Sequence, residues 1–184
     1  MCGIVGYIGK YDTTKILLDG LKELEYRGYD SAGIAVLHGN EIDVFKAVGK
    51  LVNLEEKVNQ NNKDRYNLGI GHTRWATHGK PTEVNAHPHL GEYSYVVHNG
   101  IIENYKELKD ELTSLGHNFV SQTDTEVIVH LFEHYNNKLN DAKKAFQETI
   151  KRLEVAYAIL LIIKKDPEKI FFYKLGSPMI VGHG

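Results

Sequence analysis

The chain opens with Met1-Cys2-Gly3-Ile4-Val5-Gly6, which holds the only cysteine among its 184 residues. Because the second side chain is small, we expect Met1 to be removed, so that Cys2 carries both a thiol and a free α-amine. An α-amine, with a pKa of about 7.7–8.0, can take the proton of a thiol whose pKa is about 8.5. The pattern therefore predicts a nucleophile at the start of a first short strand, Gly3–Ile8. The alternative is a small buried apolar residue, as most free cysteines are.

Length and composition describe an ordinary globular chain. A chain of 184 residues fits one domain, and 42% hydrophobic and 25% charged residues are typical of soluble proteins. The net charge of −2 gives no electrostatic reason to expect a nucleic acid or a membrane as partner. One cysteine cannot form an internal disulfide, which favours a reducing, cytoplasmic location.

Periodicity and turn residues predict strands that alternate with helices, in a layered α+β or α/β domain. We expect helices at 13–25, 51–60, 105–115 and 142–153, and one more that opens at Thr123-x-x-Glu126 and runs to about Tyr135. We expect strands at 3–8, 31–37, 42–48, 69–73, 93–98, 156–164, 170–174 and 179–181, with hairpin turns at His38-Gly39-Asn40 and Asp166-Pro167. Thr123 and Glu126 have the spacing of a capping box that opens a helix. The segment between the strands at 69–73 and 93–98 is a long loop, and such loops are usually functional.

Polar side chains gather at the start of this long loop, in Gly71–Gly79 and Asn85–His89. The planar fork of Arg74 can hold a carboxylate through two hydrogen bonds, and Thr77 and His78 add a hydroxyl and an imidazole. The alternatives are a histidine-rich surface loop or a metal site. The metal site would use His72, His78, His87 and His89, but their spacing matches no closed zinc pattern, so no metal is predicted.

Two further segments carry candidate groups for chemistry. His98-Asn99-Gly100 closes a strand, where Asn-Gly is most often a turn. The Asn99 amide and the Gly100 N–H could instead form an oxyanion hole. Asp124 precedes a helix, where an acidic residue often only complements the helix dipole, but it could also bind an ammonium group.

Taken together, these segments resemble the class II glutamine amidotransferases, and within them the glutaminase domains of glutamine–fructose-6-phosphate aminotransferases. The resemblance spans the whole chain in order. It rests on the segments at 2–6, 24–33, 71–79, 85–89, 97–104, 123–127 and 176–178. At Tyr26–Tyr29 and Arg74-Trp75 the chain departs from the related family that makes phosphoribosylamine.

The resemblance implies a role for each matching residue. The catalytic residues would be Cys2 as nucleophile, with its own amine as base, and Asn99 and Gly100 as the oxyanion hole. Glutamine would be held by Arg74, Thr77 and His78 at its α-carboxylate and by Asp124 at its α-ammonium group. The implied loop over glutamine contains Trp75, and Arg27-Gly28 would lie against the nucleophile.

The resemblance also implies a fold and a biological setting. The expected fold is that of amino-terminal nucleophile hydrolases, two antiparallel sheets packed between helical layers (α/β/β/α). Residues 1–184 would be a glutaminase domain that lacks its last strands, and a separate isomerase domain would be absent. L-glutamine would be hydrolysed without a cofactor, and its ammonia would convert fructose 6-phosphate to glucosamine 6-phosphate in a homo-oligomeric parent enzyme. An inactive module that binds or senses glutamine is the alternative.

Overall fold

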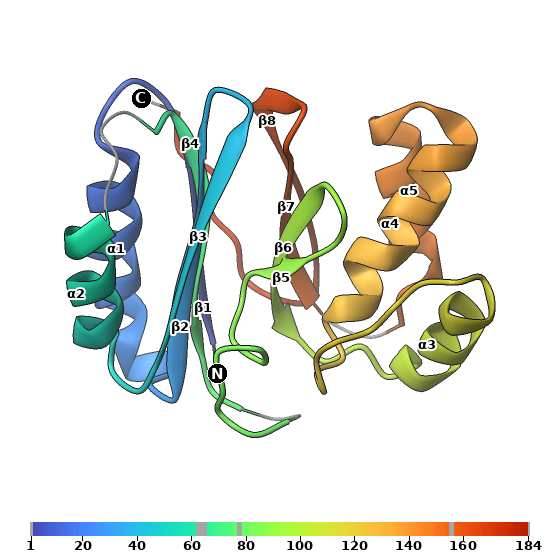
Figure 1. Ribbon diagram of the computed structural model, residues 1–184, viewed down its shortest axis with the longest axis horizontal. Coiled ribbons are helices and arrows are strands. Elements are labelled where there is room, and N and C mark those ends of the chain that lie inside the picture. Colours follow the sequence, from blue (N-terminus) through green and yellow to red (C-terminus); the bar gives the residue numbers. More distant parts are fainter. Residues whose placement is uncertain (1, 62–65, 77–78, 155–156, 184) are drawn as a thin grey trace.

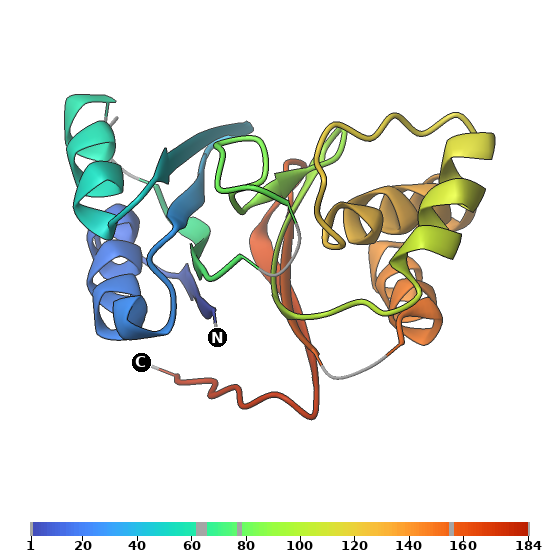
Figure 2. The same ribbon diagram turned by 90° about the horizontal axis from the view of Figure 1, so that it is seen from below.

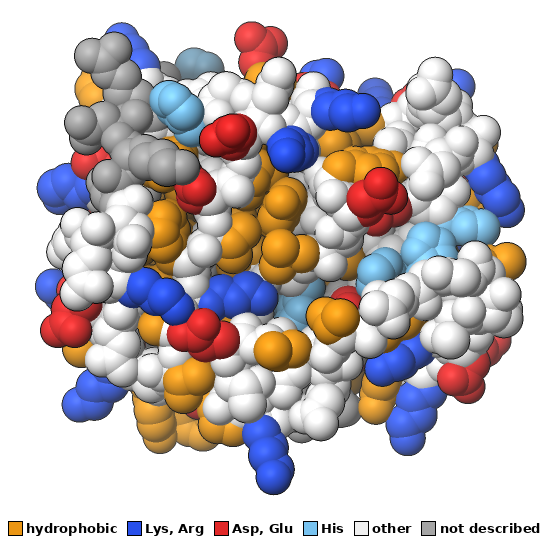
Figure 3. Space-filling model, in the orientation of Figure 1, with side chains coloured by type: hydrophobic (Ala, Val, Ile, Leu, Met, Phe, Trp, Pro, Cys, Tyr) orange, Lys and Arg blue, Asp and Glu red, His pale blue; other side chains and the backbone are white. Residues whose placement is uncertain are grey.

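Two four-stranded antiparallel sheets face each other, and each is covered on its outer side by helices (Figure 1). The computed structural model describes residues 2–61, 66–76, 79–154 and 157–183. The arrangement confirms the predicted four-layer α/β/β/α fold. None of the helices in these residues is long and apolar enough to cross a membrane. Lys and Arg side chains are interspersed with Asp and Glu on the face in Figure 3, as the small net charge predicts.

The first sheet is built from the amino-terminal half of the chain, in the order β1-β4-β2-β3. Its outer face is covered by α1 and α2, whose buried leucines pack on the sheet. The elements of this half are β1 (Gly3–Ile8), α1 (Thr13–Leu24), the 3-10 helix η1 (Glu25–Arg27), β2 (Ser31–His38), β3 (Glu41–Val48), α2 (Leu51–Asn61) and β4 (Leu68–Arg74).

The second sheet follows the order β5-β6-β7-β8 and is covered by α3, α4 and α5. The elements of this half are β5 (His89–Leu90), β6 (Ser94–Gly100), α3 (Tyr105–Ser114), α4 (Glu126–Leu139), α5 (Ala142–Arg152), β7 (Tyr157–Ile163) and β8 (Asp166–Leu175). The buried carboxylate of Glu133 on α4 accepts the backbone N–H groups of Glu92, Tyr93 and Ser94, each at 2.9 Å. These bonds fix α4 to the start of β6.

Aliphatic side chains from both sheets form the core between them. Ile70 of β4 meets Val97 of β6 and Leu160 of β7 in one buried cluster. A strand that is buried on both faces has a continuous run of apolar residues in its sequence. This is seen in β7, which is buried along its whole length. This central core sets how the ends of β1, β4 and β6 lie relative to one another.

Three local predictions were wrong. The turn between β7 and β8 lies at Lys164 and Lys165, and Pro167 belongs to the edge strand β8, where a missing N–H is tolerated. The predicted capping box does not form, because Glu126 accepts the N–H groups of Val120 and Ser121 instead.

The third wrong prediction is the strand at 179–181. In the described chain after β8, the β contact is a single bridge between Tyr157 and Gly176. Residues beyond that bridge run across to the side of the first sheet (Figure 2).

Candidate active site

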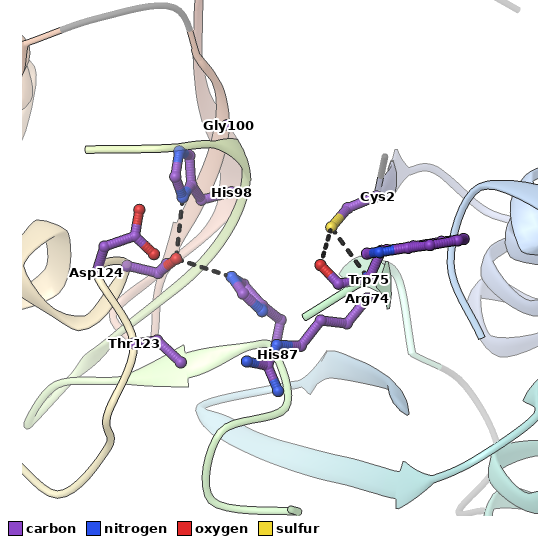
Figure 4. A pocket seen from close by; sticks show the side chains of 9 residues that line it. Cys2, Arg74, Trp75, His87, His98, Gly100, Thr123 and Asp124 are labelled. Carbon is purple, nitrogen blue, oxygen red and sulfur yellow. Dashed lines mark hydrogen bonds between the residues drawn. The ribbon is translucent and has the colours of Figure 1, made fainter. Parts of the chain in front are cut away.

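A pocket lies where the ends of the two sheets meet, and it brings together five of the predicted site residues. These are Cys2, Arg74, Trp75, Gly100 and Asp124, with His87, His98, Thr123 and Thr125 completing the lining (Figure 4). The first three come from the first sheet and its β4 end, and the others come from the second half of the chain. The pocket is narrow, with a cavity of about 20 Å³.

The sulfur of Cys2 is held against the backbone of Trp75. The Trp75 N–H donates to Cys2 Sγ at 3.2 Å, and the Trp75 carbonyl oxygen lies 3.6 Å from the same sulfur. Burial raises the pKa of the Cys2 thiol, although the hydrogen bond from Trp75 acts in the opposite direction. The thiol is therefore protonated near neutral pH and needs a base before it can attack.

The predicted oxyanion-hole residues lie beside the nucleophile. Gly100 lines the pocket with a φ of 149°, a backbone conformation that favours glycine. The Asn99 side-chain amide donates to the carbonyl oxygen of Cys2 at 3.0 Å. Asn99 is thus next to the nucleophile, but its amide is engaged by the backbone of Cys2 in this structure.

The two predicted charged groups for an amino acid are both buried at the pocket. Arg74 donates to the carbonyl oxygens of Gly79 at 3.1 Å and Lys80 at 3.3 Å, so its guanidinium fixes the following loop. One carboxylate oxygen of Asp124 accepts the N–H of Ile102 at 2.8 Å. A cation and an anion therefore stand on opposite sides of the same small cavity.

Gly28 lies next to the backbone segment that contacts the nucleophile, and the predicted roles of Arg27 and Gly28 in fixing the terminus stay predictions. Arg27 ends η1, and Gly28 presses against the backbone of Arg74 and Trp75. A Cβ at Gly28 would lie 2.6 Å from the carbonyl carbon of Arg74, so only glycine fits there. Thr77 and His78 lie outside the described residues, and their roles stay predictions.

Asp30 is a site residue that sequence reasoning did not single out. Its carboxylate accepts the N–H of Ala76 and the hydroxyl of Ser31, and it lies 3.9 Å from the Arg74 guanidinium. The signal available in the sequence was its place in the segment 24–33, but its main partner is a backbone group 46 residues away.

Four buried histidines form the wall of the pocket and the space behind it. The rings of His72 and His87 stack with centroids 3.9 Å apart, and His87 meets His89 edge to face. The Thr125 hydroxyl lies 3.0 Å from His87 Nε2 and 2.9 Å from His98 Nδ1, the two dashed contacts from one oxygen in Figure 4. These histidines are parts of the core, which corrects the view of them as a surface loop.

Burial keeps these imidazoles uncharged. It lowers the pKa of His72 to about 3, and it lowers the pKa of His87, His89 and His98 as well. Among the described residues, no group of three or more His, Cys, Asp or Glu side chains is placed to hold a metal ion. Among the described residues that line the pocket, Arg74 and Asp124 therefore carry its charges, and Asp30 lies next to Arg74.

The family model described as a glutamine amidotransferase domain matches residues 72–174. That match covers more than half of the chain and includes Arg74, Trp75, Gly100 and Asp124 of the pocket, whereas Cys2 precedes it. The chain belongs to the glutamine amidotransferase family.

Relatives of this glutamine amidotransferase domain share its sequence from end to end. It is 61% identical over 182 residues to glutamine–fructose-6-phosphate aminotransferase [isomerizing] of Campylobacter jejuni, covering 99% of this chain and 30% of that protein. It is 55% identical over 184 residues to the protein of the same name from Helicobacter pylori, covering all of this chain and 31% of that protein. The chain thus spans under a third of the length of these relatives.

A solved structure supports the same fold for this amidotransferase domain. Glutamine phosphoribosylpyrophosphate amidotransferase from B. subtilis, solved with ADP and GMP, superposes with a TM-score of 0.75 at 26% identity. The similarity covers 89% of this chain and 35% of that chain. The layered architecture is therefore shared with an amidotransferase whose sequence has diverged widely.

Proposed function

We propose that this domain hydrolyses the side-chain amide of glutamine through a thioester on Cys2. One observation carries the proposal: the Cys2 sulfur opens into the same pocket as Arg74 and Asp124. A buried guanidinium suits the α-carboxylate of an amino acid, and a buried carboxylate suits its α-ammonium group. The family match independently supports glutamine as the amino acid.

The α-amine of Cys2, once freed by removal of Met1, takes the thiol proton. The sulfur then bonds to the amide carbon of glutamine, and the carbonyl electrons move to oxygen, which the Gly100 N–H and the Asn99 amide stabilise. The carbon–nitrogen bond breaks, and ammonia leaves with the proton returned by the amine. Water attacks the thioester carbon, glutamate departs, and the thiol is restored.

Two features of the resting site constrain this reaction. Partial burial raises the pKa of the Cys2 thiol, so an adjacent base is needed to deprotonate it near neutral pH. A cavity of about 20 Å³ holds about one water, so glutamine enters only when the rim moves. For the oxyanion hole to form, Asn99 must also exchange its bond to the Cys2 carbonyl oxygen for one to the substrate.

The names of the relatives extend the proposal to the whole protein. We propose that residues 1–184 are the glutaminase domain of a larger enzyme, and that ammonia passes to fructose 6-phosphate at an isomerase domain formed by sequence outside this range. The resulting product would be glucosamine 6-phosphate. A cytoplasmic location completes the proposal and is supported by the single cysteine, whereas a homo-oligomeric parent enzyme is proposed from the family resemblance alone.

The test combines glutamate release with covalent trapping. The processed protein is incubated with glutamine, and in parallel with a glutamine analogue that carries an electrophilic carbon at the amide position. We expect glutamate from the parent, none from Cys2→Ala, and a mass increase that maps to Cys2. A matched variant with an uncleavable residue before Cys2 should fold normally and release no glutamate.

Two outcomes would count against the mechanism. Glutamate release by the Cys2→Ala variant would remove the thiol from the reaction. Glutamine binding without hydrolysis or trapping in the processed protein would instead identify an inactive sensing module.

A further inference from the structure

Asp30 contacts the chain on both sides of Trp75. Its N–H donates to the Arg74 carbonyl oxygen at 3.2 Å, and its carboxylate accepts the N–H of Ala76. Its own carbonyl oxygen accepts the N–H of Gly49 at 2.8 Å, just after β3. Asp30 therefore connects the residue after β3 to Arg74, the last residue of β4, and to Ala76 beyond it.

The residue between these two contacts is the one that touches the nucleophile. The Trp75 N–H points at Cys2 Sγ at 3.2 Å, and the peptide units before and after it are bonded to Asp30. The backbone of Arg74 and Trp75 also lies so close to Gly28 that an added Cβ would clash with it. The direction of the Trp75 N–H is therefore set by Asp30 rather than by Trp75 itself, whose ring is half exposed and packs edge-on to Tyr29.

The negative charge of Asp30 and the hydrogen bonds that Asp30 makes have opposite effects on the stability of the Cys2 thiolate. A nearby carboxylate disfavours a thiolate, whereas a backbone N–H that donates to the sulfur favours it. The cation that faces Asp30 is Arg74, at 3.9 Å, and its charge favours the thiolate. The charge of Asp30 should therefore lower the reactivity of the thiol, whereas the hydrogen bonds of Asp30 should raise it. Substitutions that remove one of these effects can distinguish them.

We propose that Asp30 is a positioning residue that holds the Trp75 N–H against the Cys2 sulfur and so keeps the thiolate accessible in the buried site. The inference deepens the proposed function at the same nucleophile. Its test measures thiol reactivity and needs no glutamine hydrolysis, so the two proposals can fail separately.

The experiment follows alkylation of the protein by iodoacetamide between pH 6 and 10. Because Cys2 is the only cysteine, alkylation mapped to a cysteine by peptide mass reports this one thiol. Asp30→Asn keeps an oxygen acceptor for the Ala76 N–H but removes the charge, so its thiol should react about two- to fivefold faster than the parent at pH 7. Asp30→Ala removes both the acceptor and the charge, and its Cys2 thiol should react about three- to tenfold more slowly than that of Asp30→Asn.

Two further variants make the result interpretable. Asp30→Glu keeps the charge but displaces the acceptor by one methylene group, so it should react more slowly than the parent and gives the answer if Asp30→Ala does not fold. Asp12→Asn is the matched control, because Asp12 also accepts a backbone N–H but does so at the start of α1. Its alkylation profile should equal that of the parent.

Equal pH profiles for Asp30→Asn and Asp30→Ala would overturn the proposal, since the hydrogen bond would then have no effect on the sulfur. Parent-like reactivity in Asp30→Glu would overturn it as well. Circular dichroism melts identify which variants are folded before their rates are compared.

Discussion

Lowering the pH from 7 to 5 should destabilise this fold through the buried imidazole of His72. The ring lies between the sheets, with Nε2 at 3.0 Å from the His98 carbonyl oxygen. Burial lowers its pKa to about 3, whereas an unfolded histidine has a pKa of about 6.5. Between these values the unfolded chain binds one more proton than the folded chain. The stability from the uncharged ring is thus complete above about pH 6.5 and is lost progressively as the pH falls towards 3.

The structure sets the size of this effect. Each pH unit inside the window costs about 1.4 kcal/mol per histidine, so His72 alone should reduce the free energy of unfolding by about 2 kcal/mol between pH 7 and 5. Burial lowers the pKa of His87, His89 and His98 too, so their contributions add in the same direction. A loss of this size is a substantial part of the stability of an ordinary domain.

Urea unfolding at pH 7, 6 and 5 measures the effect in the parent, in His72→Asn and in a control, His38→Asn. Replacing His72 should reduce the slope of unfolding free energy against pH by up to about 1.4 kcal/mol per unit. His38 is an exposed histidine at the β2–β3 turn, outside the buried cluster, so its replacement is the matched control for losing one histidine. The same slope in His72→Asn as in the parent would refute the reasoning.

Three further substitutions test other parts of the structure. Glu133→Gln places an amide group among the three backbone N–H groups that the carboxylate accepts, so urea unfolding should show a loss of about 2–3 kcal/mol, and parent-like stability would be contrary to this account. Gly33→Ala puts a Cβ against the carbonyl oxygen of His87, so its melting temperature should fall sharply or the protein should not fold; an unchanged melting temperature would show that the backbone moves aside easily. Asp124→Asn can still accept the Ile102 N–H but loses the charge, so calorimetry should show glutamine binding weakened about tenfold or more. Unchanged affinity there would mean that Asp124 serves only the backbone.

Local sequence patterns predicted the structure correctly where the stabilising interactions join residues that are close in the sequence. The turn at His38-Gly39-Asn40 predicts the β2–β3 hairpin, and Gly39 adopts the positive φ of 59° that such a turn requires. The leucine spacing on α1 likewise predicts the face that packs on the first sheet. The failed capping box shows the limit, because the N–H groups that Glu126 accepts are brought to it by the preceding loop.

The candidate site shows the same difference between features set by nearby residues and features set by distant ones. The lone cysteine and the Arg74 segment drew attention to groups that the fold does place in one pocket. The pattern could not show that His72 and His87 are buried and uncharged, because their burial depends on two sheets meeting. Asp30 was missed for a similar reason: its main partner is the backbone N–H of Ala76, 46 residues away, and every residue type except proline carries such a group.

The bond from the Asn99 amide to the Cys2 carbonyl oxygen joins one sheet to the other. Cys2 leads into β1 of the first sheet, whereas Asn99 belongs to β6 of the second. The position of the sulfur relative to Gly100 therefore depends on the position of one sheet relative to the other. Ile70, Val97 and Leu160 set that register from inside the core. A substitution in the core between the sheets therefore changes the stability of the fold and the reactivity of Cys2 together, since repacking this layer moves one half of the pocket past the other.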